Sequence, residues 1–176
     1  MRSQVPKEQL GERISRLLEG QPAAGRMVYV AAGFLVNYYS VVQILDSARK
    51  EGVNSAALLV ARQPGKDAPS VFKIQIPAEP AVDEVLPLKP DPLTLVVSIG
   101  ANDKVLLNKE PMGDSVDTAK LSQTLTQVFQ QRKEQEKTVV IKARRSTRYG
   151  QVVRIIDAAR GAGANPIVLQ LDDLDL

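Results

Sequence analysis

The densest group of side chains that could bind a partner is a cluster of cations in the last third of the 176-residue chain. Its members are Lys142, Arg144, Arg145 and Arg148, and it continues to Arg154 and Arg160. Such a cluster could bind an acidic protein, anionic lipid headgroups, peptidoglycan carboxylates or nucleic acid. A solvated loop and helix face without a partner explains the same charges equally well. The cluster is therefore a candidate partner-binding site, and it supplies no acid or base for catalysis.

The residues that most enzymes use for catalysis are missing from this sequence. It contains no Cys and no His, which excludes thiolate nucleophiles, disulfides, imidazole metal ligands and the commonest general base. The isoelectric point of about 9.2 favours phosphates. Aromatic residues, however, make up only 4% of the sequence, too few to stack on bases. We therefore expect a non-enzymatic protein that uses no cofactor or metal and binds no nucleic acid.

An apolar loop is the second candidate contact. Phe34, Leu35 and Val36 separate an expected strand from an expected helix, whereas Ser146 and Thr147 stand at the corresponding place later in the chain. If exposed, the loop would contact another protein or the other half of the chain. Core packing is an equally good explanation. Tyr38 and Tyr149 open the two helices that follow, and we expect both rings to pack in the core.

The carboxylates have simple structural explanations. Asp46 and Asp157 stand three residues before Arg49 and Arg160 within expected helices, a spacing that favours salt bridges. The tail carries Asp172, Asp173 and Asp175. We expect this acidic tail to remain in solvent, where it could attract the cationic cluster of a neighbouring molecule.

The elements that position these residues occur twice, at a constant offset of 111 residues. Tyr38 pairs with Tyr149, and the register holds without a gap from Leu10 to Leu58. Other matched pairs are Val28 with Val139, Asp46 with Asp157, Gly52 with Gly163 and Asn54 with Asn165. A match of this length indicates an internal duplication.

Each copy shows the pattern helix, strand, helix, strand. Apolar residues at helical spacing predict helices that begin near Leu10 and Leu121, and a second pair that begins at Tyr38 and Tyr149. Apolar runs at 27–32 and 138–143 predict buried strands, and residues 56–60 and 166–171 predict the closing strands. A strand, helix, strand unit implies two parallel strands and a right-handed connection.

The two copies differ in what precedes them. Runs at 93–99 and 104–108 around Ala-Asn-Asp predict a β-hairpin ahead of the second copy. The first copy has no such hairpin, because its counterpart would begin before Met1. We therefore expect a partial module at residues 1–63 and a complete module at 93–176. The Pro-rich linker at 64–92 has a possible edge strand at 71–76.

The second copy resembles the periplasmic domain of the ExbD/TolR biopolymer-transport family. The resemblance rests on Leu95-Val-Val-Ser-Ile-Gly, Val105-Leu-Leu-Asn, Val140-Ile-Lys-Ala, Tyr149-Gly-Gln-Val-Val, Ile156-Asp-Ala-Ala-Arg and Gly163-Ala-Asn-Pro-Ile. It implies an α/β, two-layer fold made of two tandem modules. Each module would have a small mixed sheet with two helices on one face. Arg144 departs from the family, which often shows Asp at this place, so no role of that carboxylate is expected here.

The resemblance also implies a function and partners. Family members are inner-membrane proteins that form a proton-driven motor with an ExbB/TolQ-like channel subunit. They pass energy to a TonB/TolA-like protein or to peptidoglycan. The family's proton-carrying carboxylate lies in a transmembrane helix, and the longest apolar run here, residues 27–36, is about half of the roughly 20 residues that a bilayer requires. We therefore expect a periplasmic part attached to the inner membrane through a segment not present in this chain. A soluble peptidoglycan- or ligand-binding module without motor function is the alternative.

Single-domain relatives dimerise, so the resemblance suggests how the two copies are arranged. We expect them to pack with approximate two-fold symmetry as a pseudo-dimer, using a sheet edge or a helix face. Use of the sheet edges between chains, as a homo-oligomer, is the alternative. The partner-binding residues of this interpretation are Lys142, Arg144, Arg145, Arg148 and Phe34.

Overall fold

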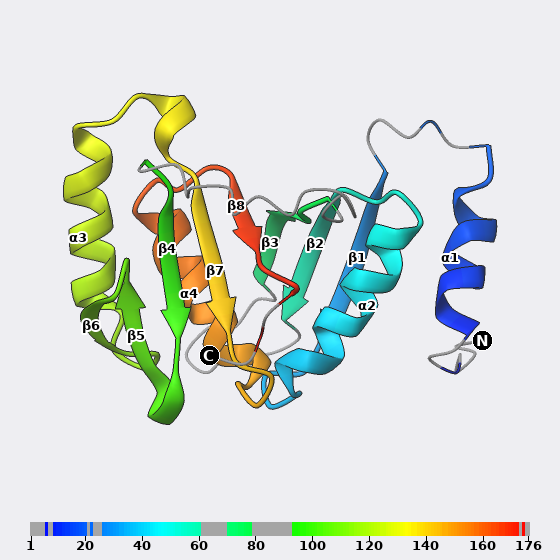
Figure 1. Cartoon of the computed structure of the whole chain (residues 1–176), viewed down its shortest axis with the longest axis horizontal. Helices are drawn as coiled ribbons and strands as arrows, with labels where there is room; N and C mark the ends of the chain where they lie inside the picture. Colours follow the sequence, from blue (N-terminus) through cyan, green and yellow to red (C-terminus); the bar gives the residue numbers. More distant parts are fainter. Residues whose placement is uncertain are drawn as a thin grey trace, which may run out of the picture.

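The computed structural model describes residues 6, 9–20, 22, 26–60, 70–78, 93–172 and 174, and these residues form a single mixed sheet with α-helices packed on it (Figure 1). The helices are α1 (Leu10–Leu18), α2 (Tyr38–Lys50), α3 (Ala119–Gln130) and α4 (Tyr149–Gly161). The strands are β1 (Met27–Ala32), β2 (Ser55–Val60), β3 (Ser70–Gln75), β4 (Leu95–Ile99), β5 (Lys104–Leu107), β6 (Glu110–Asp114), β7 (Val139–Ala143) and β8 (Ile167–Leu169). Their order is β1-β2-β3-β8-β7-β4-β5-β6. The predicted α/β class is confirmed.

In the first half of the chain, residues 9–78, α2 connects two parallel strands. Val28 of β1 lies opposite Ala56 of β2, as expected for a strand, helix, strand unit. Asn37 caps α2 because its side chain accepts a hydrogen bond of 2.9 Å from the Tyr39 N–H. The helix ends before Gly52, whose φ of 77° is one that glycine adopts without strain.

The second half, residues 93–174, repeats this unit with α4 between the parallel strands β7 and β8. Val152, Ile156 and Ala159 of α4 are fully buried, as helical spacing predicts. The predicted hairpin is confirmed as β4 and β5, and β4 also lies parallel to β7. α4 therefore buries its apolar face in the core of this half, where the alternate residues Val139, Ile141 and Ala143 of β7 are also fully buried.

The sequence pattern did not reveal β6. Asn108 and Lys109 have positive φ values of 47° and 78° and form a two-residue turn from β5 into β6. Pro111 and Gly113 interrupt the apolar pattern of this strand, because Pro cannot donate to a sheet and Gly has no side chain to pack. The predicted hairpin is therefore the first part of a three-stranded meander.

The expectation of two separate small sheets is wrong. The run at 71–76 was expected to be an edge strand, but β3 is an interior strand between β2 and β8. It pairs with β2 in antiparallel fashion along its whole length, and it meets β8 in parallel at one bridge between Gln75 and Val168. The two halves thus share one sheet through β3. The rest of the expected linker, apart from residues 76–78, lies outside the described residues.

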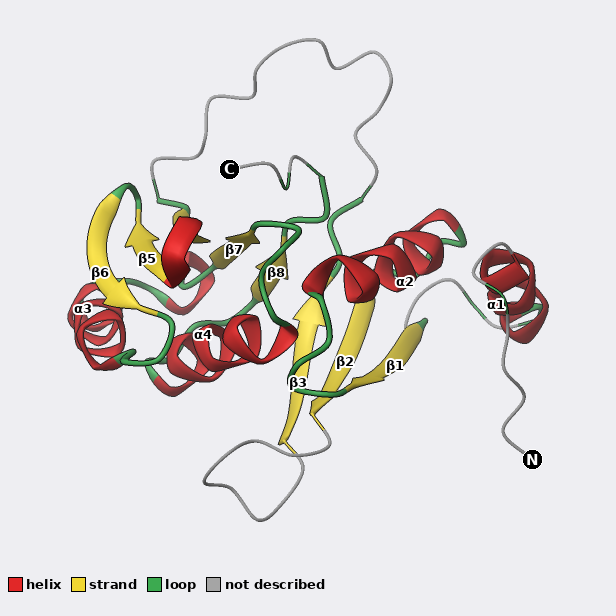
Figure 2. Ribbon diagram, turned by 90° about the horizontal axis from the view of Figure 1, so that it is seen from below, coloured by secondary structure: helices red, strands yellow, loops and turns green. Residues whose placement is uncertain are grey.

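The helices of the two halves cover opposite faces of this twisted sheet. Figure 2 shows α2 on one side of β1, β2 and β3, and α4 on the other side of β7 and β8. Each has a helix on its outer flank: α1 packs beside α2, and α3 packs beside α4 and β6. α1 and α3 consequently lie at the two ends of the molecule (Figure 1). The first turns of α2 and α4 come together near the middle.

Candidate functional site: the junction of the two halves

The two loops that contain the candidate residues meet each other, at the point where α2 and α4 begin (Figure 1). Asn37 and Arg148 form an antiparallel bridge. The Tyr38 N–H donates to the Thr147 carbonyl at 2.9 Å, and the Tyr149 N–H donates to the Val36 carbonyl at 2.8 Å. These two hydrogen bonds are reciprocal, because the 111-residue offset relates their donors, Tyr38 and Tyr149, and also their acceptors, Val36 and Thr147. We call residues 34–39 and 145–150 the junction.

Two cation–π contacts flank the junction. The Arg154 guanidinium carbon lies 4.9 Å from the centre of the Phe34 ring, and that of Arg145 lies 5.0 Å from the centre of the Tyr39 ring. Each contact joins the two halves of the chain, and each is worth about 0.5–1 kcal/mol where water reaches it. Phe34 is half-buried and packs on the second half of its own chain. The apolar loop was expected to contact either another protein or the other half, and Phe34 makes the second of these contacts.

Phe34 reaches α4 because Gly150 leaves room for its ring. A Cβ atom built on Gly150 would lie 2.4 to 2.5 Å from three carbons of the Phe34 ring. The Gly150 N–H also donates to the Phe34 carbonyl at 2.9 Å. The residue 111 positions earlier is Tyr39, so the glycine breaks the repeat at this point. That mismatch is the one signal by which the sequence could have indicated the contact.

Tyr38 and Tyr149 lie in the core at the junction, as predicted. Both side chains are fully buried, and neither phenol oxygen has a hydrogen-bond partner in the described part of the protein. Burial raises the pKa of both phenols above the ordinary value of 10.0, and for Tyr38 the proximity of Tyr149 adds to the effect. The two tyrosine rings therefore contribute to the junction by apolar packing, and their hydroxyl groups are shielded from water.

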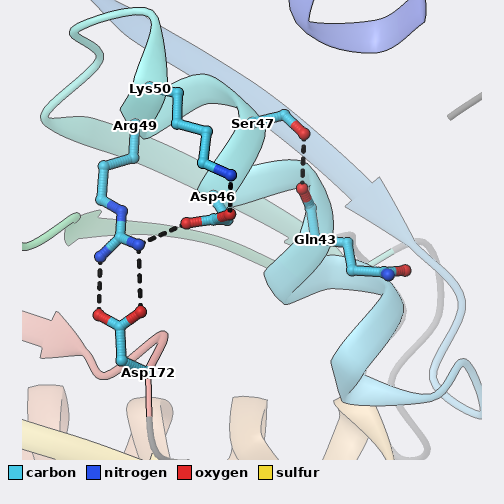
Figure 3. Close-up of polar contacts among 6 residues, drawn as sticks. All are labelled: Gln43, Asp46, Ser47, Arg49, Lys50 and Asp172. Atoms are coloured by element: carbon cyan, nitrogen blue, oxygen red, sulfur yellow. Dashed lines mark hydrogen bonds and ion pairs between the residues drawn. The ribbon is translucent and has the colours of Figure 1, made fainter. Parts of the chain in front are cut away.

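A second link between the halves joins α2 to the segment after β8. The Arg49 guanidinium donates two hydrogen bonds, of 2.8 and 3.1 Å, to the Asp172 carboxylate (Figure 3). The Arg49 side chain is only 7% exposed, and it also pairs with Asp46 at 2.5 Å, as predicted from their spacing. Asp172 is exposed to solvent, as expected, but it also pairs with an arginine of its own chain, because the buried Arg49 needs a second acceptor. Asp173 and Asp175 lie outside the described residues.

The matching arginine of α4 makes the converse contact. Arg160 donates a hydrogen bond of 3.0 Å to the Val71 carbonyl of β3. Each helix thus uses its arginine to hold the segment that follows the closing strand of the other half. A hollow of about 410 Å³ beside Arg49 is lined by both halves, including Tyr39, Lys50 and Arg145.

Neutralising Asp172 tests the first of these links through the pH dependence of stability. The Arg49 hydrogen bonds lower the pKa of the Asp172 carboxyl below its ordinary value. The stabilisation is therefore complete above about pH 4 and disappears as the pH falls through the lowered pKa. Asp172→Asn is expected to cost about 1 kcal/mol or less at pH 7, because the side chain is 55% exposed, and progressively less as the pH falls through the lowered pKa.

Urea unfolding of both proteins between pH 2 and pH 7 measures this difference. Asp103→Asn, which changes an exposed aspartate in the β4–β5 hairpin, serves as the control and should leave the curve parallel to that of the wild type. A cost for Asp172→Asn that is the same at pH 2 and pH 7 would show that the ion pair does not stabilise the fold.

The four predicted cations lie at the end of β7 and in the loop between β7 and α4, beside the junction. Lys142 and Arg144 are half-buried, and Arg145 and Arg148 are exposed. The Gln151 side chain accepts a hydrogen bond of 3.0 Å from the Arg148 backbone N–H, which fixes the start of α4. The fold therefore brings all five predicted partner-binding residues, Phe34 among them, to one region of the molecule.

A comparison with known protein families identifies the class of protein. The family model described as biopolymer transport protein ExbD/TolR matches residues 65–174. The chain belongs to the ExbD/TolR family, whose members are accessory components of biopolymer transport. No curated protein matches the sequence. Within the described residues, every helix is too short or too polar to cross a membrane.

Proposed function

We propose that the chain is a non-enzymatic, periplasmic part of a proton-driven ExbD/TolR-like transport complex, where it binds partner proteins and transmits force to them. The single observation that carries this proposal is the family match, which spans β3 to β8 and so contains the complete second half. The partners implied are an ExbB/TolQ-like channel subunit and a TonB/TolA-like protein or peptidoglycan. Attachment to the inner membrane through a further segment is part of the same proposal.

A force-transmitting part must resist separation of its own halves, and the junction suits this requirement. The proposal is that the two halves arose by duplication and form a pseudo-dimer within one chain. Its support is the pair of reciprocal hydrogen bonds at the junction and the contacts that the two equivalent arginines, Arg49 and Arg160, each make with the opposite half. The single sheet through β3 adds a third connection.

Co-purification tests the main proposal. The tagged chain, isolated from the membranes of the cells that natively produce it, is expected to retain an ExbB/TolQ-like protein through detergent extraction. Failure to retain it, together with capture of the chain by purified cell wall, would overturn the motor function in favour of a peptidoglycan-binding module.

Charge reversal tests the proposed partner-binding residues. Arg144→Glu with Arg148→Glu is expected to weaken partner retention at least tenfold, and added salt should weaken the wild-type interaction in the same direction. Lys133→Glu is the matched control, because Lys133 is an exposed cation in the turn before β7. Equal retention by the double variant and the control would show that the cationic cluster is only a solvated surface.

A further inference from the structure

The outer edge of β1 is the less protected of the two edges of the sheet. β1 ends the strand order, and no described strand pairs with its outer side. Its sequence, MVYVAA, contains no charge and no Pro, and it pairs with β2 without a bulge. The opposite edge strand, β6, carries Glu110, Pro111 and Asp114 and pairs with β5 through a register shift. Charges, prolines and bulges prevent an edge strand from pairing with other chains, and β1 has none of them.

In the second half, a strand does pair with the edge that corresponds to the outer edge of β1. β7 has the same place before α4 that β1 has before α2, but β7 is flanked on its outer side by β4, which runs parallel to it. Beneath this cover Val139, Ile141 and Ala143 are all fully buried. The residues 111 positions earlier are Val28, Val30 and Ala32. Of these, Val28 and Ala32 remain partly exposed, as expected for a strand that no described strand flanks on its outer side.

The outer helix of the first half is incompletely covered as well. α3 packs against β6, and its Leu121 and Leu125 are 1% and 0% exposed. The corresponding residues of α1, Leu10 and Ile14, are only half-buried, and the Leu17 side chain is 69% exposed. An apolar helix surface and an unprotected strand edge thus occur together in the first half. The strands β4, β5 and β6 cover both features in the second half.

We propose that this position beside β1 and α1 is a docking site for a β-strand of a partner protein, which adds to β1 in parallel as β4 adds to β7. The added strand would carry aliphatic residues at alternate positions on the side of the helices, as Leu95, Val97 and Ile99 do in β4. Its other face tolerates small polar residues such as Ser98. Backbone hydrogen bonds would provide affinity, and the alternate aliphatic residues would provide specificity.

A second copy of this chain fits the position less well than a partner strand does. The aliphatic strand of a second copy, β4, is already held between β7 and β5. The edge that it could offer instead, β6, carries the charges, proline and bulge that oppose pairing. Pairing of β1 with the β1 of another copy remains as an outcome that the test distinguishes.

The probe is a synthetic peptide with the sequence of residues 94–108, the chain's own β4–β5 hairpin. Titrated into the isotope-labelled full chain, it is expected to shift the NMR signals of β1 and α1 and to slow amide exchange in β1. Leu17→Glu should lower the affinity at least tenfold, because it places a charge on the exposed apolar surface of α1 that the proposal assigns to the docking site. Val116→Glu is the matched control, since Val116 is also 69% exposed but lies after β6. A peptide of scrambled order should not bind.

Three results would overturn the proposal. Shifts confined to β7 and α3 would mean that the peptide replaces the chain's own β4. Concentration-dependent shifts in β1 without peptide, abolished by Leu17→Glu, would identify a homodimer edge. Absence of binding would show that the β1 edge is closed to other strands. Because the assay uses the isolated chain and a peptide, none of these results bears on co-purification with a channel subunit.

Discussion

Replacing Tyr149 with Ala is expected to lower the free energy of unfolding by about 3–5 kcal/mol, whereas Tyr149→Phe should change it by less than about 1 kcal/mol. The ring fills the core at the junction, so its removal leaves a cavity between α2, α4 and the sheet. The hydroxyl contributes little, because it has no hydrogen-bond partner among the described residues. Urea unfolding at neutral pH measures both variants, and equal costs for Ala and Phe would contradict the assigned role of the ring.

The same two tyrosines should make the protein sensitive to alkali. Their pKa values are raised by burial, so the folded state binds the phenol protons more tightly than the unfolded state does. Their contribution to stability is complete below about pH 10 and is lost as the pH rises above it. The double variant Tyr38→Phe and Tyr149→Phe should therefore lose stability less steeply above pH 10. Tyr29→Phe is the control, because Tyr29 is 68% exposed, and it should follow the wild-type curve.

Gly150→Ala is expected to destabilise the protein by about 2–3 kcal/mol, since the new methyl group would overlap the Phe34 ring. Phe34 or the start of α4 must then shift, and the junction loses its packing. In the background of Phe34→Ala the same substitution should cost almost nothing, because the overlapping ring is gone. A double-mutant cycle measured by thermal or urea unfolding gives this coupling directly.

Gly161→Ala provides the matched control for the glycine substitution. Gly161 is the last residue of the same helix, and a Cβ atom there meets nothing within 4 Å. The change should be neutral or stabilise the protein by up to about 1 kcal/mol, because Ala favours the helix more than Gly does. If both glycine variants behaved alike, the contact between Phe34 and α4 would not hold the halves together.

Local signals in the sequence predicted most of the elements. The apolar spacing placed α2 and α4, and the Ala-Asn-Asp turn placed the β4–β5 hairpin. These features depend on residues a few positions apart, where backbone geometry and side-chain periodicity decide the outcome. The mixed α/β class followed from their alternation.

The connections between the halves could not be read from the sequence in the same way. The ion pair between Arg49 and Asp172 joins residues 123 positions apart, and nothing local distinguishes Asp172 from other acidic residues of the tail. The interior place of β3 depends on one bridge to β8, and β6 is concealed by its Pro and Gly. The resemblance to a family indicated the function, but only the fold shows that the candidate residues gather at the junction.

Native-state hydrogen exchange measures directly whether the junction makes the two halves one cooperative body. The buried amides of β2 in the first half and β7 in the second are expected to open with the same free energy, and Gly150→Ala should lower both by the same amount. Opening of β2 at a lower free energy than β7, unchanged by Gly150→Ala, would show two independent modules that the junction does not couple.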